Sequence, residues 1–114
     1  MYRGGGLAHC NGVIENNVIS RNWAGIGGGL ADCNASIARN LIAENLGYGG
    51  GGGLARCGGI IVGNLIVGNS TDGSGGGLAY CDGVIQNNTV ADNRARSPAG
   101  GLAYCGGSIQ SCIV

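Results

Sequence analysis

The sequence predicts an all-β fold, a parallel β-helix (solenoid) of about four to five coils with about 24 residues in each coil. Three observations lead to this prediction. The motif Gly-Gly-Gly-Leu-Ala-x-Cys recurs along the whole chain, with Ala99 in the first glycine position of the fifth copy. Its cysteines are 23 or 24 residues apart, and self-similarity at one period indicates a repeat architecture. Every apolar run is short and interrupted by Gly or Asn, which form helices poorly.

Each repeat is expected to form about three short strands joined by tight corners, and the stacked coils to form three parallel sheets. The alternation in 40–42 and 64–66, with small and β-branched side chains, is typical of strands of two to five residues. One repeat cannot bury its apolar face alone, so successive coils must pair their strands in parallel.

Recurring apolar positions predict continuous columns of side chains inside the solenoid. Leucine stands three residues before each motif cysteine, and isoleucine four residues after it. A third apolar position follows nine residues after the cysteine. These positions and the cysteines make up the predicted core: Leu7, Leu30, Leu54, Leu78 and Leu102; Cys10, Cys33, Cys57, Cys81 and Cys105; Ile14, Ile37, Ile61, Ile85 and Ile109; Ile19, Ile42, Ile66, Val90 and Val114.

Two asparagine positions recur in the same way, seven and twelve residues after the cysteine. Asparagine tolerates left-handed backbone angles, so these residues are expected at the corners, with their amides bonded from coil to coil. The two series are Asn17, Asn40, Asn64 and Asn88, followed by Cys112, and Asn22, Asn45, Asn69 and Asn93. The segments 23–26, 46–50, 70–74 and 94–98 vary most, which predicts loops on one side of the solenoid.

The repeat at 75–90, Gly-Gly-Gly-Leu-Ala-Tyr-Cys-Asp-Gly-Val-Ile-Gln-Asn-Asn-Thr-Val, resembles those of right-handed parallel β-helix proteins, the pectate-lyase-like superfamily. It is most similar to the Gly-Gly-Gly and Asn-rich repeats of large bacterial surface and secreted proteins. The resemblance covers nearly the whole chain. It implies a right-handed coil, an extracellular or cell-surface location and a structural or binding role that includes carbohydrate contact. The same resemblance implies an alternative, a fragment of a polysaccharide lyase or glycoside hydrolase.

Residues 1–114 are expected to form a single domain, a fragment of a longer solenoid without end caps. Its open strand edges predict end-to-end self-association. The net charge of zero argues against nucleic acid and anionic membrane as partners, and no run approaches the roughly 20 apolar residues of a membrane span.

Six cysteines raise the question of a metal or disulfide site, but no Cys-x-x-Cys pair exists and His9 is the only histidine. Stacked cysteines point their Cβ atoms in parallel, which disfavours bridges between coils. Buried, reduced thiols are therefore predicted, with neither a metal nor a cofactor.

One column does not repeat, and it carries the candidate binding site. The residues just before the five motif cysteines are His9, Asp32, Arg56, Tyr80 and Tyr104. They are expected to point outward from a strand face and to contact polysaccharide or another surface protein. The alternative is an exposed Asp32–Arg56 ion pair with tyrosines stacked beside it. No catalytic residue is assigned, and Trp23 and Tyr48, in the predicted loops, form an alternative sugar platform.

Overall fold

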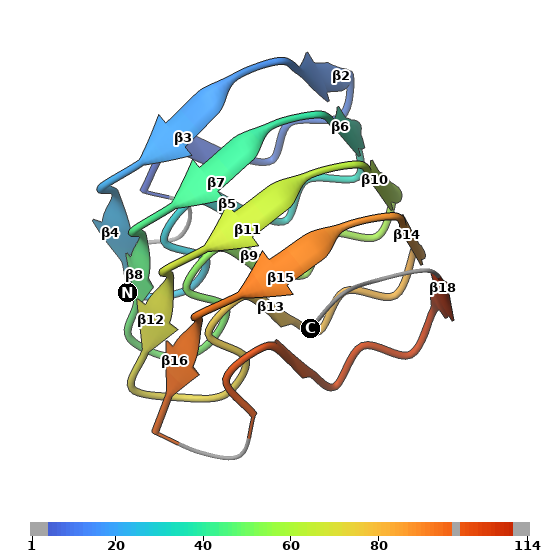
Figure 1. The fold of residues 1–114 in the computed structure, drawn as a ribbon. Helices are drawn as coiled ribbons and strands as arrows, with labels where there is room; N and C mark the ends of the chain where they lie inside the picture. The colour runs from blue at the N-terminus through green and yellow to red at the C-terminus, as the bar shows by residue number, and fades with distance from the viewer. Residues whose placement is uncertain (1–4, 97–98, 111–114) are drawn as a thin grey trace.

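The computed structural model describes residues 5–96 and 99–110, and these residues wind into a β-solenoid of about four turns. All strand pairs are parallel, and each coil lies directly on the previous one (Figure 1). The described residues include no helix, and so none that is long and apolar enough to cross a membrane. The predicted all-β solenoid is confirmed.

The strands form four sheets. The first contains β1 (Leu7–Ala8), β5 (Leu30–Ala31), β9 (Leu54–Ala55), β13 (Leu78–Ala79) and β17 (Leu102–Ala103). The second contains β2 (Val13–Glu15), β6 (Ser36–Ala38), β10 (Ile60–Val62), β14 (Val84–Gln86) and β18 (Ser108–Gln110). The third contains β3 (Val18–Ser20), β7 (Leu41–Ala43), β11 (Leu65–Val67) and β15 (Thr89–Ala91). The fourth contains β4 (Trp23–Ala24), β8 (Leu46–Gly47), β12 (Ser70–Thr71) and β16 (Arg94–Ala95).

The fourth sheet corrects the expectation of three sheets and of loops in the variable segments. Each variable segment begins with a two-residue strand, and pairing starts with a backbone bond such as that from the Ser70 N–H to the Asn45 carbonyl, 2.8 Å long. The inward positions of this sheet carry the small residues Ala24, Gly47, Thr71 and Ala95. Such residues give no apolar signal in the sequence, so the strands were not predicted.

The predicted core columns are confirmed in the inner coils, whereas Ile109, in the last described strand of its column, is 44 % exposed. Ile61 of β10 pairs in register with Ile37 of β6 and Ile85 of β14, and all three are buried. Leu54 is equally buried, in register with its counterparts above and below. The motif cysteines fill a third column as free thiols. Cys112 and Val114 lie outside the described residues.

Two ladders of asparagine side chains run through the buried corners. Asn64 Oδ1 accepts bonds from the backbone N–H and from Nδ2 of Asn40, at 2.9 and 3.0 Å. Asn64 Nδ2 donates in turn to Asn88 Oδ1 at 3.0 Å and to the carbonyl oxygen of Ile37 at 2.8 Å. Asn45 makes the equivalent bonds in the second ladder. The predicted amide ladders are therefore present and satisfy buried backbone groups.

The backbone angles at these corners differ from the prediction. The ladder asparagines are not left-handed; the residue before each of them is, for example Arg39 with φ 54° and Gly63 with φ 65°. An asparagine that points inward must keep an ordinary backbone for its amide to reach both neighbouring coils. The preceding residue therefore makes the sharp turn and exposes its own side chain. Glycine forms another corner: Gly51 has φ 60°, and a Cβ on Gly52 would collide with the carbonyl oxygens of Ser70 and Gly76.

Candidate functional site

The five predicted site residues occupy one corner of the solenoid. His9, Asp32, Arg56, Tyr80 and Tyr104 each follow a Leu-Ala strand and precede an inward cysteine, and all have φ between 54° and 57°. The expected position on a strand face was therefore wrong. A left-handed residue at this point turns the chain and still projects its side chain outward, so the column remains a surface feature. Arg56, Tyr80 and Tyr104 are exposed, and Asp32 is half-buried.

The two tyrosines of this corner column stack on each other. Their ring centroids are 5.1 Å apart and the planes differ by 12°. Because the coils are in register, equivalent corner residues come within stacking distance, and such a pair contributes about 0.5–1.5 kcal/mol beyond its buried area. The predicted stacking of tyrosines is confirmed.

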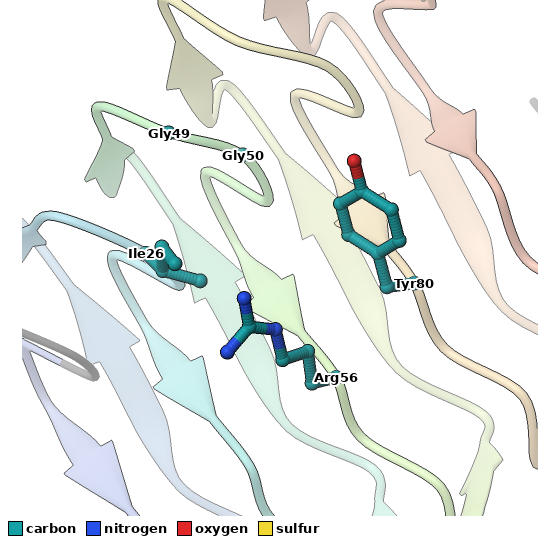
Figure 2. A pocket seen from close by; sticks show the side chains of 5 residues that line it. All are labelled: Ile26, Gly49, Gly50, Arg56 and Tyr80. Carbon is teal, nitrogen blue, oxygen red and sulfur yellow. The ribbon is translucent and has the colours of Figure 1, made fainter.

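Arg56 and Tyr80 line a pocket of about 200 Å³ together with Ile26, Gly49 and Gly50 (Figure 2). The Arg56 side chain extends toward Ile26, and the Tyr80 ring stands on the next coil. Gly50 presents bare backbone beside the Tyr80 ring, and a Cβ at this position would lie 3.8 Å from the ring. We call this site the Arg56–Tyr80 pocket. It combines a guanidinium with several N–H donors, an aromatic ring and bare glycine backbone.

The structure brings together only part of the predicted set. Tyr104 stacks on Tyr80 but does not itself line the pocket, and neither do His9 and Asp32. The expected Asp32–Arg56 ion pair is not among the ion pairs that join described residues, because the Arg56 side chain lies toward Ile26 instead. Those pairs are Arg21–Glu44, Glu15–Arg39 and Asp72–Arg96.

A second aromatic pair lies on the neighbouring face. Trp23 and Tyr48 meet edge to face, with ring centroids 6.0 Å apart and an interplanar angle of 71°. Trp23 is 68 % exposed although it belongs to strand β4, which corrects its predicted place in a loop. The pair borders a shallow depression of about 370 Å³, also lined by the ion pair of Arg21 with Glu44.

Arg21 and Glu44 were missed at the sequence level. Their Nε and Oε2 atoms are 3.0 Å apart. The signal that would have found them is positional: each stands directly before an asparagine of the second ladder, in successive coils and with opposite charge. Residues at equivalent corner positions of adjacent coils become neighbours. We call the surface formed by Trp23, Tyr48, Arg21 and Glu44 the Trp23–Tyr48 platform.

Among residues 5–96 and 99–110, no group of three or more His, Cys, Asp or Glu side chains converges to hold a metal ion. No protein-family model matches the chain, and comparisons with curated proteins and with solved structures likewise give no match. The parallel β-solenoid therefore rests on the structure, and the superfamily rests on the resemblance of the repeats.

Proposed function

We propose that this solenoid is a structural and binding module of a secreted or cell-surface protein of the pectate-lyase-like superfamily, and that its Arg56–Tyr80 pocket binds carbohydrate. The composition of the pocket supports this function. A sugar ring packs its C–H face on an aromatic ring and bonds its oxygens to nearby donors, and the pocket offers both in Tyr80 and Arg56.

The observation that carries the proposal is the conformation of the corner column. A left-handed backbone costs a non-glycine residue about 1 kcal/mol or more. Two other corners of the coil use glycine in the third repeat, at Gly63 and Gly68. The corner of Arg56 and Tyr80 carries a non-glycine residue in every described coil, although the chain holds 27 glycines. Strain of this kind is concentrated at binding sites, so we infer that these side chains are kept for contact with a ligand.

The neighbouring platform extends the proposed site. Tyr48 is followed directly by Gly49 and Gly50 of the pocket. The Arg56–Tyr80 pocket and the Trp23–Tyr48 platform thus flank one short segment, and an extended glycan fits this arrangement better than a single sugar does.

A glycan array with purified variants tests the proposal. We expect Arg56→Ala and the double variant Tyr80→Ala, Tyr104→Ala to lose at least tenfold in apparent affinity, a loss of about 1.4 kcal/mol. Asp92→Ala is the matched control, because Asp92 is also an exposed left-handed corner residue but lies outside the pocket. Asp32→Ala should bind like wild type.

Two outcomes would replace this proposal. The first is glycan binding that persists in the Tyr80→Ala, Tyr104→Ala variant and is lost in a Trp23→Ala, Tyr48→Ala variant. This result would assign the binding site to the Trp23–Tyr48 platform. Cleavage of polygalacturonate by the wild type, abolished by Arg56→Ala, would favour the alternative of a lyase or hydrolase fragment. A wild-type chain that binds no glycan on the array contradicts carbohydrate binding itself.

A further inference from the structure

The motif cysteines form an uninterrupted column of thiols through the interior. Cys33, Cys57 and Cys81 are buried, and Cys10 and Cys105 at the two ends are half-buried. Each thiol donates a hydrogen bond to the carbonyl oxygen of the alanine two residues earlier, with Sγ···O distances of 3.3–3.5 Å. This repeated bond gives all five sulfur atoms the same orientation.

The spacing of these sulfur atoms follows from the strand register. The Leu-Ala strand before each cysteine pairs residue for residue with the strand in the next coil. The Cys10 N–H also points at Cys33 Sγ, 3.5 Å away. Neighbouring strands are about 4.8 Å apart, so equivalent atoms repeat at this distance. A zinc–thiolate bond is about 2.3 Å long, and a linear sulfur–metal–sulfur unit with bonds of this length spans about 4.6 Å. A two-coordinate metal ion fits between successive thiolates.

The side chains around the thiol column determine which kind of metal ion can bind there. Ca²⁺ and Mg²⁺ require oxygen ligands, and Zn²⁺ requires four ligands in a tetrahedron. The column packs against apolar side chains such as Leu54 and Ile61, and no described group of three or more metal-ligating side chains converges on it. Thiolates favour soft ions, of which Cu(I) is the biological example.

We propose that the two ends of the thiol column bind Cu(I), one ion between Cys10 and Cys33 and a second between Cys81 and Cys105. As each ion binds, two S–H bonds break, two sulfur–copper bonds form, and two protons leave to solvent. Copper stays in the +1 state, so no oxidant or reductant is consumed. The ends are favoured because their outermost thiols are half-exposed, whereas Cys57 is buried on both sides. This site is independent of the proposed carbohydrate function.

The test is an anaerobic titration of the folded chain with Cu(I) in competition with a colorimetric Cu(I) chelator. All proteins carry Cys112→Ser, because Cys112 lies outside the described residues. We expect two ions per chain, one ion in Cys10→Ser, one in Cys105→Ser and none in the double variant. Cys57→Ala is the matched control and should keep both ions. Circular dichroism establishes that each variant is folded.

A second measurement avoids any loss of folding in the serine variants. Alkylating Cys105 in the folded Cys112→Ser chain must remove one of the two ions. X-ray absorption of the loaded chain should show two sulfur neighbours per copper. The proposal is overturned if the double variant still binds two ions, if alkylation changes nothing, if copper has three or more ligands, or if the chelator retains all the copper.

Discussion

Left-handed backbone angles at the corners link single residues to the shape of the coil. Asp92 has φ 53°, whereas the equivalent residue one coil earlier is Gly68. Glycine adopts this conformation without steric cost, so Asp92→Gly should raise the free energy of unfolding by about 0.5–1 kcal/mol. Urea denaturation measures the change. Ala91→Gly is the control: Ala91 lies in strand β15 with an ordinary φ, so its replacement should destabilise the chain, and equal effects of the two would contradict the strain argument.

The amide ladder is a second feature at the residue scale. Asn64→Ala removes the acceptor of the Asn40 backbone N–H and the donor to the Ile37 carbonyl oxygen, in a fully buried corner. Unsatisfied buried groups cost about 1–3 kcal/mol, and we expect a loss of stability in this range by chemical denaturation. The exposed Asn11, replaced by alanine, serves as the control. A neutral Asn64→Ala variant would show that the ladder does not contribute to stability.

The cysteines differ in reactivity along their column. The pKa of Cys105 is lowered from 9.0 to about 7, because its thiolate form accepts a hydrogen bond from the Cys81 thiol, which otherwise donates to the Ala79 carbonyl oxygen. The hydrogen bond with Cys105 and burial raise the pKa of Cys81 well above its ordinary value. Alkylation of Cys105 should therefore rise with pH to half its maximum near pH 7, while Cys33, Cys57 and Cys81 react slowly in the folded chain.

Mass spectrometry of the alkylated chain follows each cysteine separately. Cys81→Ala removes the donor and should shift the alkylation profile of Cys105 to higher pH. An unchanged profile would exclude this hydrogen bond as the cause. Under non-reducing conditions, a bridge between successive column cysteines would contradict the assignment of free thiols. Cys112 is also expected to react fast, although it lies outside the described residues.

At the scale of single strands, burial alternates within three residues. In β10 the side chain of Ile61 is 0 % exposed and that of its neighbour Ile60 is 51 % exposed. Ile61→Ala should destabilise the chain by about 2–5 kcal/mol, because it leaves a cavity between two coils that cannot collapse. Ile60→Ala is the matched control and should change the free energy of unfolding by less than about 0.5 kcal/mol. Similar losses in both variants would mean that the strand face is assigned wrongly.

For the whole molecule, we expect the ends of the stack to govern any association between chains. Within the ladder the bonds between asparagine side chains run in one direction: Asn64 Oδ1 accepts from Asn40 of the previous coil, and Asn64 Nδ2 donates to Asn88 of the next coil. The last strand of the second sheet, β18, carries Ile109 at an inward position, yet this residue is 44 % exposed. Unpaired parallel edges seek a partner, so sedimentation should show end-to-end association that increases with concentration.

Two charge substitutions distinguish association through the ends of the solenoid from association through its sides. Ile109→Lys should weaken association, whereas Ile60→Lys, on the exposed outer face of the central strand β10, should leave it unchanged. A chain that sediments as a monomer at every concentration, or one in which only Ile60→Lys reduces association, would contradict end-to-end contact.

The sequence by itself determined the repeat, the apolar columns and both asparagine ladders. Each of these features depends on one residue type that recurs at the same position of successive coils. The fourth sheet was not predictable in this way, because Ala24, Gly47, Thr71 and Ala95 share small size and no chemical type. The left-handed conformation was predicted for the ladder asparagines, because asparagine tolerates it. It belongs instead to the residue before each of them, whose type varies from coil to coil.

Only the tertiary structure decided which side chains of the candidate site meet. The Arg56–Tyr80 pocket joins residues from three successive coils, Ile26, Gly50 and Tyr80 among them. Which residues line the pocket depends on the direction in which each corner residue projects its side chain. The period of the repeat does not specify that direction. Asp32 and Arg56 are adjacent in the column but form no ion pair with each other, whereas Arg21 and Glu44 form one at a different corner. A repeat places equivalent positions above one another, but the turn geometry at each corner decides which of them make contact.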